Sequence, residues 1–557
     1  MASSIPFPVL FLLATAIESL AITQAVPHEY LPEPPLSRVF VRLLVLQMVG
    51  FGVYKCLIYP FLLSPLRSLP KAPGERPILG NGLATFERPA GTSFLKWMTE
   101  IPNDGLIHFR GFFHQDRLLV TDLKALSEIL VTRSYDFEKP KRLRDFLRFV
   151  LGDGLILVEG DVHKFQRKNI MPVFTFRHIK DLYPIFWQKA TQLTQGVNQQ
   201  VDENPENNSS DVTSVVEINH WANQVTMDII GMAAMGRDFQ ALKNGQDPLI
   251  VNYEELLEPS KEKQIYFLLN LLFPQSLIRW LPWKINGEMK RIVENVQRIS
   301  LELVRDKKEM VKTEPESQKD LLSLLIRSNN FSDQQLVDQM MTFLAAGHET
   351  TSSAFTWATF LLATHAEIQK ALRKEIQENM PSPNTQPPAD FDLATVLESL
   401  PLLNGVCNEV IRLYPTVPTT VRDAVKDTQL AGVHIPNGTQ IVLSPWGINR
   451  NPHFWGKNAE EFVPERWIDT DEKTGERKPN NAGGAPNNYA ILTFLHGPRS
   501  CIGQGFAKAE LRCLVAAFVG SFQMDLADPN EKVIPSGVVT TKPKNGMHLR
   551  LKHLGGW

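Results

Sequence analysis

The stretch Phe494–Gly503, FLHGPRSCIG, decides how this 557-residue chain is interpreted. It places Cys501 in a short loop that is bounded by Gly497 and Gly503 and made basic by Arg499. The apolar residues that follow recur at helical spacing, so Cys501 is predicted to stand just before a helix N-terminus. The helix dipole and Arg499 would both lower the pKa of a thiol there. Both glycines allow backbone conformations that a β-carbon forbids and leave room for a flat ligand. A thiolate held in this way suits an axial ligand of haem iron.

The spacing aromatic-x-x-Gly-x-Arg-x-Cys-x-Gly resembles the haem-binding signature of the cytochrome P-450 superfamily. The alternative is that Cys501 is a buried loop residue, which is the more common situation for a cysteine without such a pattern around it. The resemblance implies haem as cofactor, with Cys501 as the metal ligand and Phe494, Arg499 and Gly503 beside it. It also implies a mainly α fold, a triangular helical domain with a small β-rich region, over about residues 65–551.

Composition narrows the classes of function. With 43% hydrophobic residues the chain can bury a large core, and a net charge of −2 argues against a nucleic-acid partner. Four cysteines do not make a disulfide framework. There is no zinc motif, P-loop or dinucleotide fingerprint, so reducing power is expected from a partner protein.

Two apolar runs open the chain. Ile5–Val26 carries one charge, Glu18, and Val39–Leu66 is interrupted by Arg42 and Lys55. Each is about long enough to span a bilayer, and basic residues after the second favour a cytosolic body. Two spans would form a hairpin, one would leave the N-terminus lumenal, and either run could instead be a buried or interfacial helix.

We therefore predict a membrane anchor of one or two transmembrane helices (1–66), a proline-rich hinge (67–82) and a catalytic domain (83–557). The hinge resembles that of microsomal members of the superfamily. The expected location is the endoplasmic reticulum membrane, with the catalytic domain in the cytosol.

The longest helix is predicted over Ser332–Ala363, where Ser332 and Gln335 make a capping box. The sequence AGHETT, from Ala346 to Thr351, stands in its middle. Ala346 and Gly347 would let a planar ligand approach the backbone. The segment resembles the superfamily's oxygen-activating segment, which implies that Thr350 holds dioxygen or water and that Glu349 relays protons. Without the haem signature, such a polar patch would more often be structural.

Several basic residues are candidates for holding the haem propionates. In the superfamily a tryptophan four residues before an arginine often does so, and here His163 and Arg167 occupy those positions. Both can donate to a carboxylate, although a solvated basic face is the alternative. Arg422 stands where relatives often place such an arginine, and His496 and Arg499 are further candidates.

A structural charge cluster is expected around Glu409. Arg412 lies three residues on in the predicted helix Pro401–Tyr414, and Arg466 lies in Pro464–Trp467. In the superfamily such a Glu-Arg-Arg triad supports the core, so these residues are assigned to folding.

Other segments have weaker signals. We expect short strands at Ile107–Phe109 and Leu118–Val120, a hairpin turning at Pro436–Gly438, and polar loops at Gln199–Asp211 and Asp471–Asn488. Ile265–Trp283 is either a membrane-dipping segment or ordinary core. The segments expected to touch substrate are Val417–Val421 and Val538–Thr541.

The function implied is a haem-thiolate monooxygenase that oxidises a lipophilic small molecule with O2 and NADPH electrons. The electrons would come from a membrane-bound NADPH–haemoprotein reductase, with cytochrome b5 as a second donor, docking near Lys164, Lys168 and Lys508. The run Tyr135–Pro140 resembles fungal microsomal enzymes of secondary metabolism and suggests a terpenoid or polyketide-derived substrate. The alternatives are a reductase-independent haem-thiolate isomerase or dehydratase and a non-enzymatic membrane haem-binding protein.

Overall fold

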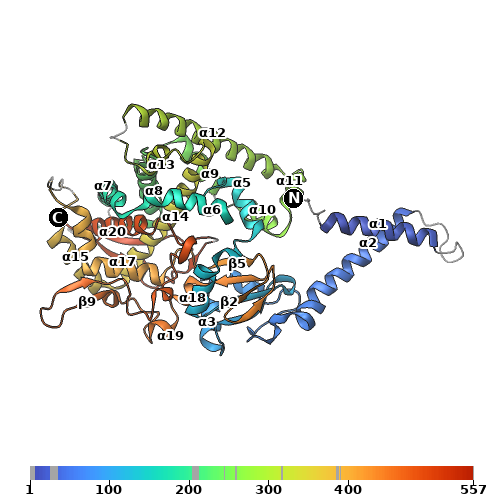
Figure 1. Cartoon of the computed structure of the whole chain (residues 1–557). Helices are drawn as coiled ribbons and strands as arrows, with labels where there is room; N and C mark the ends of the chain where they lie inside the picture. The colour runs from blue at the N-terminus through green and yellow to red at the C-terminus, as the bar shows by residue number, and fades with distance from the viewer. Residues whose placement is uncertain are drawn as a thin grey trace.

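The helix α14 (Asp333–Thr364) crosses the molecule, and the other long helices pack around it (Figure 1). This computed structural model describes residues 7–25, 36–203, 213–243, 245–257, 260–314, 318–383, 385, 388, 390–537 and 539–555. The predicted capping box is confirmed, because the Ser332 side chain accepts from Gln335 N–H while the Gln335 side chain accepts from Ser332 N–H. Most of α14 is buried because its side chains are apolar or small on several faces.

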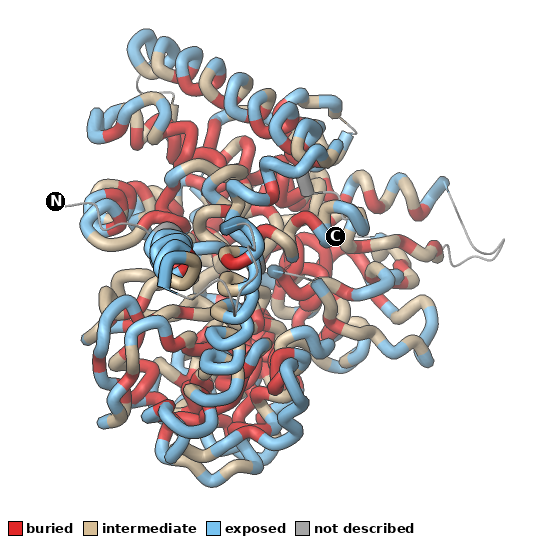
Figure 2. The backbone as a smooth tube through the Cα atoms, turned by 90° about the vertical axis from the view of Figure 1, so that its right-hand side faces the viewer, coloured by how far each residue is buried: buried red, intermediate tan, exposed pale blue. Residues whose placement is uncertain are grey.

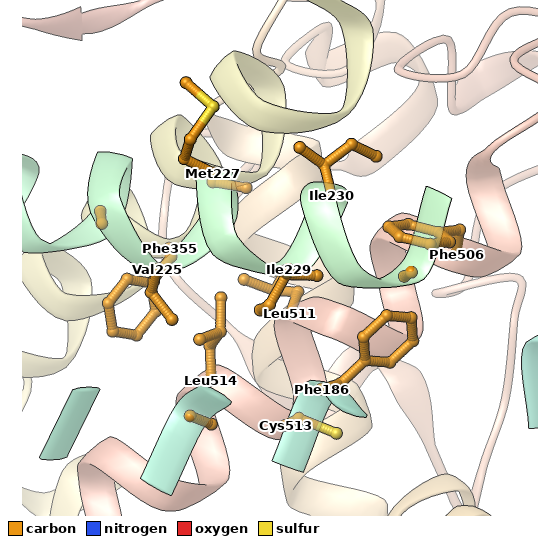
Figure 3. Close-up of a cluster of buried hydrophobic side chains, with 14 of the residues drawn as sticks. Phe186, Val225, Met227, Ile229, Ile230, Phe355, Phe506, Leu511, Cys513 and Leu514 are labelled. Carbon is orange, nitrogen blue, oxygen red and sulfur yellow. The ribbon is translucent and has the colours of Figure 1, made fainter. Parts of the chain in front are cut away.

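The main core lies where four helices meet: α7 (Phe176–Glu203), α8 (Ile218–Ile230), α14 and α20 (Gln504–Ser521). Figure 3 shows Phe186, Ile229 and Leu511 in this cluster, contributed by α7, α8 and α20. Buried aromatic side chains each remove a large apolar area from water, so this junction stabilises the fold strongly.

The remaining helices surround this junction and the sheet. They are α3 (Thr92–Glu100), α4 (Leu123–Ser127), α5 (Lys141–Leu151), α6 (Gly160–Ile170), α9 (Pro248–Leu257), α10 (Lys261–Leu272), α11 (Gln275–Trp280), α12 (Lys284–Thr313), α13 (Leu321–Ser328), α15 (Ala366–Asn379), α16 (Leu393–Ser399), α17 (Pro401–Leu413), α18 (Pro445–Ile448) and α19 (Pro452–Trp455).

A five-stranded sheet with its own apolar core lies beside the helical part, and its strand order is β1-β2-β8-β5-β3. The strands are β1 (Leu106–Arg110), β2 (Asp116–Val120), β3 (Phe137–Glu138), β5 (Thr420–Ala424) and β8 (Gln440–Leu443). The pair β2–β8 is parallel, and the other neighbours are antiparallel. The strands predicted at Ile107–Phe109 and Leu118–Val120 are confirmed, as is the mainly α fold with a small β-rich region.

Four smaller sheets complete the described part of the chain. They are formed by β4 (Thr213–Glu217), β11 (Phe522–Leu526) and β14 (His548–His553); by β6 (Thr428–Leu430) and β7 (Val433–Ile435); by β9 (Ile468–Thr470) and β10 (Arg477–Pro479); and by β12 (Pro535–Ser536) and β13 (Lys542–Pro543).

Two of the weaker predictions were wrong. A turn does form at Pro436–Gly438, where Thr439 N–H donates to Pro436 O (3.1 Å), but β7 pairs with β6 and β8 pairs with β5 and β2. The turn therefore joins two sheets and closes no hairpin. The predicted loop Asp471–Asn488 contains the strand β10. In the predicted loop Gln199–Asp211, α7 continues to Glu203, and residues 204–211 lie outside the described residues.

An antiparallel pair of apolar helices projects from the body (Figure 1): α1 (Phe7–Ala25) and α2 (Leu36–Val53), which continues as a wider helical turn to Leu63. Figure 2 shows exposed residues along this projection and buried ones inside the body. Of the described residues, one helical stretch, Leu36–Leu63, is long and apolar enough to cross a membrane, and α1 contains a shorter apolar stretch, Leu10–Ala25.

The proline-rich segment after the projection is attached to the main sheet. His108 N–H in β1 donates to Pro70 O (2.8 Å), and Ala72 N–H donates to His108 O (2.9 Å). This pairing extends the edge of the sheet toward α2 and fixes where the projection leaves the body.

Candidate functional site

The loop before α20 folds tightly around Cys501. Cys501 N–H donates to Phe494 O (2.8 Å), and Gly497 has a left-handed φ of 72°. A β-carbon on Gly497 would collide with the Leu130 carbonyl, so the loop requires glycine there. Gly503 differs from the prediction, because its φ of −87° suits any residue and a β-carbon would meet only Phe174, at 3.9 Å.

The thiol of Cys501 stands at the head of α20, as predicted. Cys501 is an exposed residue, although the neighbouring protein still desolvates its thiol and thereby raises its pKa. The Gly503 backbone N–H and Arg167 act in the opposite direction. The expectation that Arg499 lowers this pKa was wrong, since the cation close enough to do so is Arg167.

The middle of α14 is accessible between two buried stretches. Within Ala345–Thr350 every residue except buried His348 is half-buried, whereas Met341–Leu344 and Thr351–Thr359 on either side are buried. The Thr350 hydroxyl donates to Ala346 O (2.7 Å), a backbone carbonyl that in an α-helix normally accepts only from a backbone N–H. This accessible segment is where a ligand could reach the helix.

Gly347 has a packing role that was not predicted from the sequence. A β-carbon built on Gly347 would lie 2.5 Å from Ile230 Cδ1, on the facing helix α8. Glycine at this position therefore permits the close approach of two helices.

The carboxylate of Glu349 contacts the C-terminal hairpin, which is formed by β12 and β13. Its Oε1 accepts from the Thr540 hydroxyl (2.8 Å) and lies 3.4 Å from Lys542 Nζ. Thr540 lies in Val538–Thr541, which was expected to touch substrate, whereas nothing in the sequence indicated Lys542. Val538, which was expected to touch substrate in the same segment, lies outside the described residues.

The two candidates on α6 take different positions. Arg167 donates to Ser500 O (2.6 Å) and to the Ser500 hydroxyl (3.2 Å), which ties α6 to the cysteine loop. His163 is buried, and its Nδ1 lies 3.2 Å from the Tyr135 hydroxyl. Burial, reinforced by Arg499, lowers the pKa of His163 to about 4, so the imidazole is neutral at pH 7.

Lys139, Arg422 and Arg499 form a largely buried cationic cluster with one carboxylate, Glu159, and Lys139 is the half-buried member, with 22% of its side chain exposed. Arg499 Nε donates to Glu159 Oε2 (2.7 Å), and Lys139 Nζ lies 3.8 Å from Glu159 Oε1. Arg422 is buried and donates to Thr420 and to a backbone carbonyl, without a carboxylate partner among the described residues. The cluster holds more positive than negative charge.

The charges in this cluster shift one another's pKa values. Desolvation, with Arg422 close by, lowers the pKa of Lys139 to about 7. Desolvation, with Arg499 close by, lowers that of Arg422 to about 10. Buried cations need anionic partners, and a planar cofactor with two carboxylates would supply them. The residues present therefore fit the propionate side of haem. His496 is occupied elsewhere, since its Nε2 contacts Ile491 O (3.0 Å).

Comparison with known proteins agrees with this geometry. Residues 70–550 match the model of the family described as Cytochrome P450. The chain belongs to the cytochrome P450 family. This P450 is 41% identical over 510 residues to the cytochrome P450 monooxygenase sphH of Aspergillus fumigatus, covering 91% of each chain. It is 38% identical to ptmK of Penicillium ochrochloron (90% of this chain, 96% of the relative) and 36% identical to FUM15 of Gibberella moniliformis (91% of each), both also named cytochrome P450 monooxygenases.

The family membership settles the class of chemistry. This P450 is a haem-thiolate monooxygenase, since the family binds haem through a cysteine thiolate and its relatives here are monooxygenases. P450 monooxygenases take electrons from a redox partner and act on small molecules.

The predicted triad of this P450 is assembled as expected. Arg412 Nε and Nη2 donate to the two oxygens of Glu409 (2.8 Å each), and Arg466 Nε donates to Oε1 (2.9 Å). The Trp467 indole N–H also donates to Glu409 (2.8 Å). The three charged side chains are almost fully inaccessible to solvent, which fits a role in folding.

Sequence reasoning missed Lys139, Glu159 and Lys542 as members of the site. Lys139 lies within the run Tyr135–Pro140, which was noted only for its resemblance to fungal microsomal enzymes and not for the charge of Lys139. Glu159 lies four residues before His163, on the preceding loop, and this proximity was the only signal available.

Proposed function

We propose that this P450 oxidises a lipophilic small molecule with O2 and electrons from NADPH, and that Cys501 is the axial ligand of its haem. The observation that carries the assignment is the largely buried cluster of Lys139, Arg422 and Arg499, whose positive charge one carboxylate does not balance. A non-enzymatic haem-binding protein would not need the accessible acid and hydroxyl on α14.

Each group has one task in this proposal. Bound haem supplies the activation of dioxygen. Arg167, Arg422 and Arg499, with Lys139 and His163, hold its propionates by charge and hydrogen bonds. Phe494 and Gly503 border the thiolate, and Ala346 leaves the helix accessible. Thr350 holds a hydroxyl proton at Oγ1, and Glu349 takes protons from solvent and passes them on.

The test of the haem assignment is a carbon-monoxide difference spectrum of the reduced protein. Wild type is expected to give the thiolate-type band and Cys501→Ser to lose it. Cys513→Ser is the matched control, because Cys513 is buried in the core and should leave the band unchanged. A thiolate band in Cys501→Ser would overturn the assignment.

The charge cluster needs a separate test, which is haem retention. Arg422→Leu and Lys139→Leu are each expected to lower the haem content of the purified protein. Arg450→Leu, which removes an arginine that is also buried and also carries a lowered pKa but lies outside the cluster, is the control. Equal haem content in all three variants would contradict the cluster's role.

The electron donor that we propose is a membrane-bound NADPH–haemoprotein reductase, with cytochrome b5 as a second donor. Lys168 and Lys164 on α6 are exposed; Lys164 pairs with solvent-exposed Asp161 and lies over the Tyr135 ring. Lys508 on α20 is half-buried, and desolvation lowers its pKa to about 8. Lys168 and Lys164 are therefore the stronger docking cations. Lys168→Glu should slow electron transfer at low salt more than at high salt.

The N-terminal helices support a membrane anchor over residues 1–66, connected by residues 67–82 to a catalytic domain over 83–557. The Thr15 hydroxyl donates to Gln47 Oε1 (2.5 Å), and Gln47 Nε2 donates to Glu18 Oε2 (2.5 Å). Polar groups that pair between two apolar helices are expected of a hairpin in lipid, where an unpaired group is costly. We propose two spans in the endoplasmic reticulum membrane.

Part of the apolar segment Ile265–Trp283 is ordinary core and part is exposed, so each of the two alternatives, core or membrane-dipping segment, describes some of its residues. Tyr266 and Ile278 are buried in the core, whereas Trp280 is 80% exposed and Ile265 is 53% exposed. In Figure 1, α11 lies on the side of the body from which the α1–α2 projection leaves. We propose that this exposed face rests on the membrane, where tryptophan is favoured.

The substrate class that we propose is a terpenoid or polyketide-derived secondary metabolite. The relatives are monooxygenases of fungi. The sequence of the run Tyr135–Pro140 also resembles that of fungal microsomal enzymes of secondary metabolism. Feeding such precursors to cells that express the chain with a reductase identifies the product. Turnover with peroxide alone, and none with NADPH and reductase, would instead support a reductase-independent isomerase or dehydratase.

A further inference from the structure

The backbone of Thr541 attaches the hairpin formed by β12 and β13 to α14. Its carbonyl accepts from the Ser353 hydroxyl (2.5 Å) and from the Trp357 indole N–H (3.0 Å), both on α14. Its own N–H donates to Thr416 O (2.9 Å). Thr541 is buried, so these bonds fix the hairpin at a set height on the helix.

The two neighbours of this anchor both contact Glu349. The Thr540 hydroxyl donates to Glu349 Oε1 (2.8 Å), and Lys542 Nζ lies 3.4 Å from the same oxygen. The hairpin therefore engages one oxygen of the carboxylate. Within the described residues no donor is bonded to the other oxygen, Oε2.

The contact lies at the boundary between the site and the solvent. The side chains of Glu349 and Lys542 are 31% and 27% exposed, whereas Thr540 and Thr541 are buried. An ion pair in this position can exchange protons with water and is still partly shielded from it. A fully exposed pair would hold Glu349 much less firmly.

We propose that Thr540 and Lys542 are positioning residues that hold the Glu349 carboxylate in the orientation needed for proton delivery toward Thr350. This inference rests on the proposed role of Glu349 as the proton relay. In each cycle the carboxylate gains one proton from solvent and releases one toward Thr350, so that it is regenerated.

The first experiment is a double-mutant cycle on the apparent melting temperature of the haem-loaded protein, without added substrate. Lys542→Met is expected to lower the melting temperature by about 1–2 °C in wild type and to have no further effect in a Glu349→Gln background. Lys544→Met is the matched control, since Lys544 lies on the same hairpin and is exposed. Equal effects of Lys542→Met in both backgrounds would overturn the proposed contact.

The second experiment measures NADPH consumption by the haem-loaded protein with reductase, in H2O and in D2O, without added substrate. Lys542→Met and Thr540→Val are each expected to slow consumption by about 3- to 10-fold and to raise the solvent isotope effect, with recovery in Lys542→Arg and Thr540→Ser. The melting-temperature cycle could show that Lys542 and Glu349 interact while NADPH consumption and the isotope effect stay unchanged. The contact would then be purely structural, and the proposal would be overturned.

The same measurements separate this inference from the function on which it rests. If Glu349→Gln leaves consumption and isotope effect unchanged, the relay role of Glu349 fails, and with it the positioning role. The melting cycle would then still decide whether the hairpin contacts the carboxylate. If Glu349→Gln slows consumption while Lys542→Met and Thr540→Val match the Lys544→Met control, only the positioning role fails.

Discussion

Glu510 is a buried acid on α20 that the proposed mechanism does not use. It is 1% exposed, and its Oε2 has no protein partner among the described residues. Desolvation raises its pKa well above the ordinary value, while Thr351 on α14 acts weakly in the other direction. The raised pKa favours the uncharged form of this carboxyl group, which lies at the interface between α20 and α14.

Glu510→Gln is expected to gain stability relative to wild type as the pH rises. In the unfolded chain Glu510 loses its proton near pH 4.5, whereas the folded protein keeps it. Above that pH, wild type is destabilised by up to about 1.4 kcal/mol per pH unit until the folded-state pKa is reached. Glutamine does not titrate. The difference in melting temperature between wild type and Glu510→Gln should therefore widen as the pH rises above about 4.5, up to the raised pKa of Glu510 in the folded state.

Glu510→Ala serves as the control for this prediction. It also cannot titrate, so its pH dependence should follow that of Glu510→Gln, offset by a constant cost for the cavity left behind. If the melting temperatures of wild type and Glu510→Gln change with pH in parallel, Glu510 is ionised in the folded protein.

The sequence predicts single residues well where one local constraint decides them. Cys501 and Gly497 follow from the spacing of one ten-residue loop, and the loop itself requires Gly497. Gly503 and Gly347 were also recognised, but Gly503 does not need a left-handed backbone, and Gly347 has a packing role that was not predicted. The direction in which a missing side chain would point depends on the packing of other segments, which spacing does not reveal.

At the scale of elements, the packing of α8 against α14 depends on Gly347. Gly347→Ala is expected to destabilise the haem-loaded protein by about 1–2 kcal/mol, because its methyl group would collide with Ile230. Ile230→Val, which removes the colliding Cδ1, should cost about 0.5–1.5 kcal/mol alone. The double variant should be more stable than the sum of the single effects predicts.

This prediction is measured by thermal unfolding together with haem content. Additive effects of the two substitutions would show that Gly347 does not serve the helix contact. A large loss of haem in Gly347→Ala that Ile230→Val does not restore would return the glycine to its first interpretation, a position that a flat ligand approaches.

Elements with a strong local signal were predicted closely, and their partners were not. The capping box at Ser332 marks the start of α14, and Pro401 marks that of α17. The turn at Pro436–Gly438 was also recognised, yet its flanking strands joined different sheets. Strand pairing is decided by contacts between distant segments, for which a turn carries no information.

At the scale of the whole molecule, the same limit applies to the site. Lys139, Glu159 and Arg499 come from segments far apart in the chain, and only the fold brings their charges together. The balance of charge in a buried cluster is a property of that assembly, so no single motif could have predicted it. The loop around Cys501 predicts the cofactor, and the cluster indicates how the cofactor is held.

The proposed two-span anchor makes a prediction about topology. A glycosylation acceptor, with a flexible spacer, is added either before residue 7 or into residues 26–35, between α1 and α2. Two spans place the N-terminus in the cytosol and the connecting segment in the lumen, so only the second acceptor should be modified in microsomes. One span through Leu36–Leu63 would place both acceptors in the lumen, and both would be modified.

The polar contact between the helices gives this prediction its physical basis and its own test. If Gln47 pairs with Thr15 and Glu18 inside the bilayer, Gln47→Leu strands a carboxyl group in lipid. Some of the N-termini should then stay in the lumen and the first acceptor should become partly modified. Gln47→Leu combined with Glu18→Leu removes the unpaired group and should restore the two-span pattern. Unchanged modification in Gln47→Leu would mean that the pair does not lie within the membrane.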